Sequence, residues 1–204
     1  EDYKEFGQKC GIPIKTAKYS DEDGTFNSNN EYLTIINTAR VKRVDLLEYY
    51  DSRQNILDVE RNILFLLDQE LKKFKKEKGL KDFTDLLEDY IIKKDKPKFE
   101  VLFIDEAQDL SLIQWDMVRS LWVNAKKTYI AGDDDQAIFK WAGADVDHFI
   151  ALKEEVDGVE VLDQSYRIPG GPIHELSQNI IAKVQNRFDK DYKPRDEVGL
   201  LKRY

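Results

Sequence analysis

The chain has 204 residues, enough for one generous domain or two small ones, and 41% of them are hydrophobic, so a sizeable core is expected. The formal net charge of -8 argues against a protein that coats nucleic acid by bulk charge, although a local cationic groove stays compatible with it. The single cysteine excludes an internal disulfide framework and a cysteine-based zinc cluster, and no apolar run reaches the roughly 20 residues that span a bilayer.

The amino end offers two further expectations. It shows no signal-peptide pattern, which together with the cysteine count predicts a cytoplasmic location. It also lacks Met, which suggests a fragment of a longer protein.

The first half of the chain is predicted to be mostly helical. A short helix is expected over 31–39, a long one over 54–78 that ends at Gly79, and a third over 83–92 capped by Asp82. The long helix is predicted from one apolar stripe at intervals of three or four: Ile56, Val59, Ile63, Leu67, Leu71 and Phe74. The lysine-rich stretch 72–98 favours a solvated helix face over a DNA-binding patch.

After residue 97 the pattern changes to strands that alternate with helices. Strands are expected over 101–104, 128–131 and 159–162, and the continuous apolar run of the first indicates a strand buried in a parallel sheet. Helices are expected over 112–123, with Ser111 as cap, over 145–156, and from Pro172 to about residue 188. This order predicts an α/β fold with a parallel sheet.

A first group of polar residues, Asp105-Glu106-Ala107-Gln108-Asp109, follows the first of these strands. Asp105 could hold Mg²⁺, which prefers carboxylate and water oxygens, and Glu106 could deprotonate a water that attacks a γ-phosphate. This is the Walker B arrangement. Two acids after an apolar strand also occur as plain helix caps.

A second group runs from Gly132 to Ala144, after the next strand. The neutral amide of Gln136 could bond both a phosphate oxygen and a water, as a γ-phosphate sensor does. Phe139 and Trp141 flank Lys140, and aromatic faces stack on bases without regard to sequence. An isolated Trp is more often a core residue, so Trp141 could instead be buried.

A third group, Leu162-Asp163-Gln164-Ser165-Tyr166-Arg167, contains a Tyr-Arg pair. Arg167 could meet a triphosphate, because its planar donors match phosphate oxygens, and Tyr166 could lie against adenine. Taken alone, the pair fits a surface salt bridge better.

The strings DEAQDLS, GDDDQAIFKWAGAD and LDQSYR, in this order, resemble motifs II, III and IV of the UvrD/PcrA/Rep superfamily 1 DNA helicases. Residues 81–87 look like the DFxDLL segment that precedes Walker B in that family. The resemblance implies a RecA-like P-loop NTPase fold, incomplete in this chain, with a mostly helical insertion. It divides the chain into an insertion subdomain over 1–97, part of the first RecA-like domain over 98–162, and the start of the second over 163–204.

The resemblance also implies a role for each site residue, and the cofactors ATP and Mg²⁺. Asp105 would bind Mg²⁺, and Glu106 would activate water. Gln136 would sense the γ-phosphate. Three residues would lie along single-stranded DNA: Phe139, Lys140 and Trp141. Tyr166 would stack on adenine, and Arg167 would reach the γ-phosphate. Family members move 3′ to 5′ along one strand while they hydrolyse ATP.

Several positions depart from the family pattern. Phe139 stands where Tyr is frequent, Ala142 where Arg is frequent, and Ser165 where Asn is usual. Gly24 to Ser28 lacks the His of a GTFHS-like segment and is interpreted as an insertion loop. No GxxxxGK[ST] loop occurs in the 204 residues, so we expect the intact parent to be a motor and this piece alone to hydrolyse little ATP.

Other classes of function fit parts of the pattern. The same motifs serve helicase–nuclease subunits of the AddA/RecB kind. A degenerate fold that binds DNA or protein without catalysis is a second alternative, disfavoured by the intact Asp105, Glu106, Gln136 and Arg167. A P-loop enzyme that does not act on DNA is disfavoured by the aromatic segment 139–141.

Overall fold

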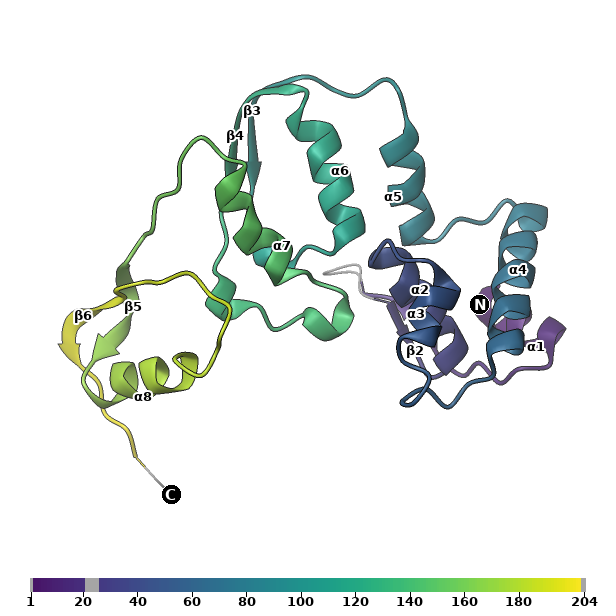
Figure 1. The fold of residues 1–204 in the computed structure, drawn as a ribbon, viewed down its shortest axis with the longest axis horizontal. Coiled ribbons are helices and arrows are strands. Elements are labelled where there is room, and N and C mark those ends of the chain that lie inside the picture. Colours follow the sequence, from purple (N-terminus) through teal and green to yellow (C-terminus); the bar gives the residue numbers. More distant parts are fainter. Residues whose placement is uncertain (1, 21–25, 203–204) are drawn as a thin grey trace.

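The computed structural model describes residues 2–20 and 26–202, and these form three parts in chain order (Figure 1). The amino-terminal part contains α1 (Asp2–Cys10), β1 (Ala17–Tyr19), β2 (Phe26–Ser28), α2 (Glu31–Val41), α3 (Leu46–Asp51), α4 (Arg61–Lys78) and α5 (Phe83–Ile92). β1 and β2 pair antiparallel. Of the stretch interpreted as an insertion loop, Gly24 and Thr25 lie outside the described residues, and the rest forms β2.

One apolar core holds the amino-terminal part together. The side chains of α4 that enter this core include Leu64, Leu67, Leu71 and Phe74, which confirms the stripe from Leu67 onward. The helix begins at Arg61, so the predicted start at residue 54 was wrong. Residues 52–57 instead close the end of α3 with turn hydrogen bonds, among them the one from the Leu57 amide to the Arg53 carbonyl, and Ile56 is left 81% exposed.

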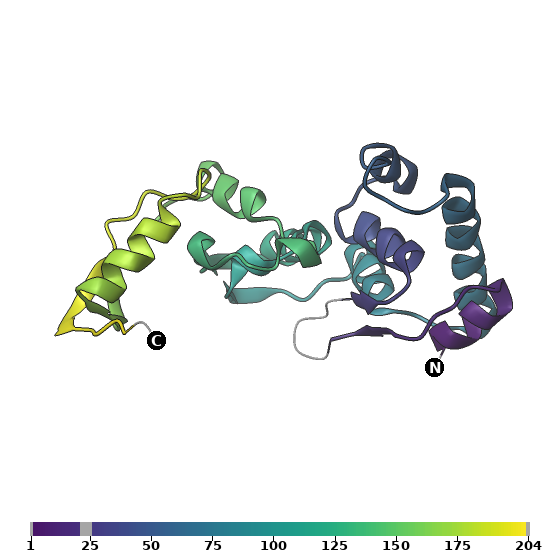
Figure 2. The ribbon, with the colours of Figure 1, turned by 90° about the horizontal axis from the view of Figure 1, so that it is seen from below.

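The central part contains β3 (Phe99–Ile104), α6 (Leu112–Trp122), β4 (Ala125–Ile130) and α7 (Val146–Ala151). β3 and β4 pair in parallel. The two helices cover one face of this small sheet (Figures 1 and 2), and their core includes Trp115 and Val118, with Ile104 and Ile130 of the strands packed against it.

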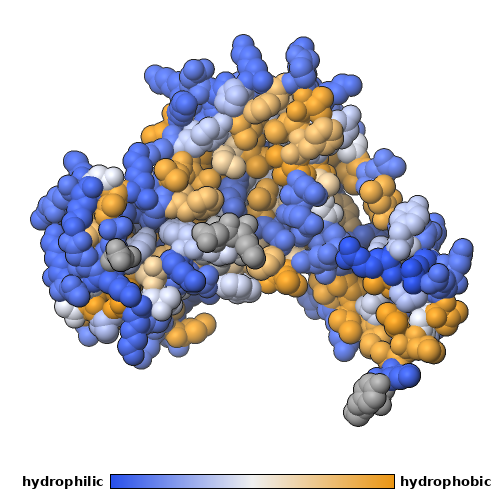
Figure 3. Space-filling model, turned by 180° about the vertical axis from the view of Figure 1, so that it is seen from behind, coloured by the Kyte–Doolittle hydropathy of each residue, from blue (hydrophilic) through white to orange (hydrophobic). Residues whose placement is uncertain are grey.

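The opposite face of the β3–β4 sheet is open and adds to an apolar area on the surface (Figure 3). Phe103 is 73% exposed there and stacks on Tyr129, with ring centroids 5.2 Å apart. The prediction that this strand is buried was therefore wrong: helices cover only one of its faces, so alternate side chains of its apolar run meet solvent.

The carboxyl-terminal part contains β5 (Gln164–Gly170), α8 (Pro172–Ile181) and β6 (Lys193–Val198), with β5 and β6 parallel. The strand predicted over 159–162 is absent: these residues have no regular structure. Ladder pairing in this part begins at Gln164, and Leu162 is 83% exposed without a neighbouring strand. The last helix ends at Ile181, so the predicted end near residue 188 was wrong.

The architecture is thus mixed α/β with small parallel sheets, in agreement with the predicted class. In the part of the chain that the structure describes, every helix is too short or too polar to cross a membrane.

Candidate functional site

The two polar loops predicted to carry chemistry begin at the same edge of the β3–β4 sheet. Ile104 pairs with Ile130 at the carboxyl ends of the parallel strands. The Ala131 amide donates to the Ile104 carbonyl at 2.8 Å, and the Ala107 amide donates to the Ala131 carbonyl at 2.9 Å. These bonds keep the loop after β3 and the loop after β4 side by side.

Asp105 and Glu106 sit at the start of the first loop, and both are exposed. Glu106 has a left-handed backbone, with φ 50° and ψ 39°, a conformation that costs a residue other than glycine of order 1 kcal/mol or more. The Asp105 carboxylate accepts a hydrogen bond from the Glu106 amide at 2.9 Å, which helps to hold this turn. Backbone strain of this kind is often found where a side chain must be aimed at a ligand.

Gln108, which the motif analysis did not single out, joins the two loops. Its side chain is 1% exposed. Its amide nitrogen donates to the Glu106 carboxylate at 2.8 Å, and its amide oxygen accepts from the Asp133 backbone at 2.9 Å. A β-carbon at Gly132 would lie 2.7 Å from that oxygen, so any other residue there would force the Gln108 side chain to shift. In the sequence, the glutamine in DEAQD and the glycine before Asp133 were the signals that could have indicated this bridge.

Burial and the nearby charge of Glu106 raise the pKa of Asp109, against the hydrogen bond from Gln108, which lowers it. One oxygen of this carboxylate is buried without a hydrogen-bond partner among the described residues. Two carboxylates, those of Glu106 and Asp109, thus lie close together on the loop after β3.

Gln136 ends a 3₁₀ turn, η2 (Asp134–Gln136), in the second loop. The side chain is exposed, and its amide nitrogen donates to the Asp133 carboxylate at 2.6 Å. Burial would raise the pKa of Asp133, but hydrogen bonds from Gln136 and Lys190 outweigh it and lower that pKa. The structure thus places Asp105, Glu106 and Gln136 around the carboxyl-terminal edge of the β3–β4 sheet.

Phe139 and Trp141 follow in the same loop, with ring centroids 6.4 Å apart. Trp141 is 67% exposed, so the alternative that buries it in the core was wrong. Lys140 lies between them and is exposed, 3.9 Å from Asp147.

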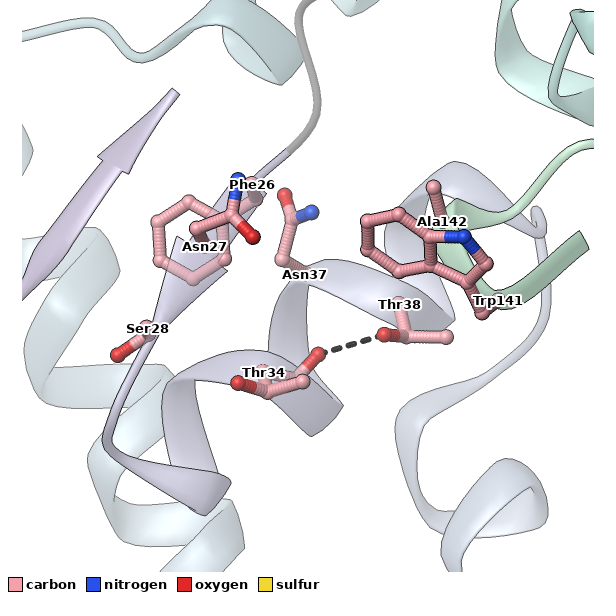
Figure 4. Close-up of a pocket in the computed structure, with 8 residues that line it drawn as sticks. All are labelled: Phe26, Asn27, Ser28, Thr34, Asn37, Thr38, Trp141 and Ala142. Atoms are coloured by element: carbon pink, nitrogen blue, oxygen red, sulfur yellow. Dashed lines mark hydrogen bonds between the residues drawn. The ribbon is translucent and has the colours of Figure 1, made fainter. Parts of the chain in front are cut away.

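Trp141 stands at the edge of a cavity of about 140 Å³ that it shares with the amino-terminal part (Figure 4). Gly143 brings the loop close to α2: its φ is 107°, and a β-carbon there would meet Val41 at 2.8 Å. The lining is largely polar and comes from β2, α2 and the aromatic loop: Phe26, Asn27, Ser28, Thr34, Asn37, Thr38, Trp141 and Ala142.

Tyr166 and Arg167 lie elsewhere, on β5 in the carboxyl-terminal part. Both are exposed, Tyr166 to 86%. β5 is separated from β3 and β4 in both ribbon views (Figures 1 and 2). Within the described part of the chain, no hydrogen bond or ion pair joins either side chain to Asp105 or Glu106.

The residues at the carboxyl-terminal edge of the β3–β4 sheet suit a Mg²⁺ ion that takes only a few of its ligands from the protein. Within residues 2–20 and 26–202, no three His, Cys, Asp or Glu side chains gather into a metal site. Mg²⁺ that accompanies a nucleotide usually keeps one or two carboxylates and takes its other ligands from water and phosphate. The exposed carboxylate of Asp105 fits that pattern.

Comparison with known proteins gives one family. The model of the UvrD/REP helicase N-terminal domain matches residues 8–157. The ATP-dependent DNA helicase srs2 of Schizosaccharomyces pombe is 32% identical over 133 residues, which cover 62% of this chain and 15% of that protein. DNA helicase II of Escherichia coli is 34% identical over 100 residues, 44% of this chain and 14% of that protein.

The Rep helicase of Buchnera aphidicola is 29% identical over 111 residues, 52% of this chain and 16% of that protein. The matched region is therefore a small share of each relative. Because the family model matches most of this chain, from the amino-terminal helices through both loops at the sheet edge, the chain belongs to the UvrD/Rep helicase family.

Proposed function

We propose that the protein containing this chain is an ATP-dependent DNA helicase or translocase that moves 3′ to 5′ along single-stranded DNA. The observation that carries this proposal is the Gln108 bridge, which joins the loop of Glu106 to the loop of Gln136 and Trp141. A hydrogen-bonded link of this kind gives a motor a route by which a change at the phosphate can reach the DNA.

The proposed ATP site is built from the two loops that follow β3 and β4. Asp105 holds Mg²⁺, and Glu106 accepts a proton from the attacking water. When bound, Mg²⁺ neutralises charge on the phosphates. The Gln136 amide gives up its hydrogen bond to Asp133 and instead bonds the γ-phosphate.

We further propose that the chain combines an insertion subdomain over 1–97, part of a first RecA-like domain over 98–162 and the start of a second over 163–204. Tyr166 and Arg167 then reach the nucleotide from the second domain, Tyr166 on adenine and Arg167 on the γ-phosphate. Since no GxxxxGK[ST] loop occurs in the 204 residues, the isolated chain hydrolyses little ATP.

The proposed DNA track passes over Phe139, Lys140 and Trp141. The exposure of Trp141 and the cavity beside it support this path, because a base that stacks on the indole needs free space next to the ring. The polar side chains of α2 can bond the edge of such a base.

The test is single-stranded DNA binding by the protein that contains this chain. Trp141→Ala is expected to weaken binding by about 1–3 kcal/mol, roughly 5- to 150-fold, and Trp141→Phe to retain most of the affinity. Tyr129→Ala, an exposed aromatic on the open sheet face, serves as the control and leaves affinity unchanged. Equal affinities for Trp141→Ala and wild type would contradict the proposed track.

A further inference from the structure

A cluster of ion pairs joins the Gln136 loop to the carboxyl-terminal part of the chain. Lys190 Nζ lies 2.8 Å from Asp133 Oδ1, 2.6 Å from Asp134 Oδ1 and 3.1 Å from Asp135 Oδ2. Arg187 donates twice to Asp135, from Nε at 2.8 Å and from Nη2 at 2.6 Å. We name residues 187–190 the clamp segment and Asp133, Asp134 and Asp135 the acidic loop.

The centre of the cluster is shielded from water, whereas the Asp133 side chain at its edge is 36% exposed. The side chains of Lys190 and Asp134 are 12% and 3% exposed, and the Phe188 backbone amide donates to Asp134 at 2.7 Å. Burial disfavours the charged form of Lys190, but its hydrogen bonds to the three carboxylates outweigh this and raise its pKa. Shielded, multiply bonded pairs of this kind hold their geometry far better than exposed surface pairs.

Two further contacts extend the attachment to α7. The ring of Phe188 meets that of Phe149 edge-on, with centroids 6.3 Å apart. Asn186, which directly precedes the clamp segment, donates to Asp147. The clamp segment is thus attached to the loop after β4 and to the helix behind it.

Asp133 is shared between the clamp and Gln136. One carboxylate oxygen bonds Lys190, and the other accepts from the Gln136 amide. In the described part of the chain, removing Lys190 would leave the guanidinium of Arg187 as the only cationic partner of the three adjacent carboxylates. Their mutual repulsion would open the turn that carries Gln136.

We propose that the clamp segment positions Gln136, with Lys190 and Arg187 as positioning residues that tie the γ-phosphate sensor to the part of the chain that carries Arg167. This role rests on the proposed function. It explains why an acidic run directly before the sensor is tolerated: its charge is compensated from more than 50 residues further along the chain.

The first test exchanges the charges of one pair in the protein that contains this chain. Asp135→Arg and Arg187→Asp are each expected to lower kcat for DNA-stimulated ATP hydrolysis about tenfold, while KM for ATP stays within about twofold. The double exchange restores the pair and recovers part of kcat, because Lys190, 3.1 Å from Asp135 in the wild type, then faces an arginine. A double variant no better than the product of the two single effects would overturn the clamp.

The second test uses Lys190 and guards against loss of folding. Lys190→Met lowers kcat, Lys190→Arg retains it, and Lys183→Met, an exposed lysine of the same region, serves as the control. Thermal unfolding identifies variants that remain folded. A folded Lys190→Met protein with wild-type kcat would overturn the clamp alone. A wild-type protein that hydrolyses no ATP with DNA would overturn the proposed function and the clamp together.

Discussion

At the scale of single residues, the sequence indicates candidate site residues, but it does not indicate which distant residues they contact in the fold. Asp105, Glu106 and Gln136 were identified by type and position, and the structure places all three at one strand edge. Gln108 and Lys190 were missed because their bonds reach 25 and 57 residues along the chain to the same aspartate. Local patterns hold no information about such distances.

Asp82 likewise has a role that the sequence predicts and partners that it does not. Its pKa also allows a prediction of how the stability of the fold depends on pH. Its role as a helix cap was predicted and is confirmed, whereas its pairing with Arg40 and Lys75 was not foreseen. Burial would raise its pKa, but these two cations outweigh burial and lower it to about 2. Because the folded pKa lies below the unfolded one, the carboxylate stabilises the fold above about pH 4, and this is lost as the pH falls towards about 2.

We therefore expect Asp82→Asn to reduce the free energy of unfolding by roughly 2 kcal/mol at pH 7 and by much less near pH 2. Urea unfolding of both proteins across this pH range measures the difference. Asp157→Asn, at an exposed position, is the control. A difference between Asp82→Asn and wild type that does not change with pH would rule out this ion-pair explanation.

At the scale of elements, helices with local end signals and the apolar strands β3 and β4 were predicted well, whereas β5 and β6 were not. The bounds of α5 and the Ser111 cap of α6 follow from side chains within three residues of each end. β6 has the sequence KPRDEV, with no apolar alternation, and is a strand because β5 pairs with it from some 30 residues earlier. Strand formation there depends on tertiary context.

The end of α4 supplies a test at this scale. Gly79 has φ 65°, and the Leu80 amide closes the helix on the Lys75 carbonyl at 2.9 Å. Gly79→Ala is expected to cost about 1 kcal/mol of stability, because a β-carbon disfavours the left-handed backbone. Gly158→Ala, where φ is not positive and space is open, should be neutral or slightly stabilising. Equal urea midpoints for the two variants would show that Gly79 does not control this helix end.

At the scale of the whole molecule, the sequence predicted the α/β class but not the arrangement of its sheets. The loops after β3 and β4 meet, whereas the strand predicted over 159–162 is absent and β5 pairs with β6 in a separate sheet. The proposed division into two RecA-like domains accounts for this separation: Arg167 would reach the nucleotide across a cleft. The chain spans 14–16% of the length of the relatives described above, so the activity assigned to the whole protein is a proposal.

The most direct measurement is DNA-stimulated ATP hydrolysis by the protein that contains this chain, compared with its Glu106→Gln form. If Glu106 accepts the proton of the attacking water, the exchange should lower kcat by about 10²- to 10⁴-fold while single-stranded DNA binding is retained. Equal rates for the two proteins would remove Glu106 from the chemistry and contradict an ATP site at the edge of the β3–β4 sheet.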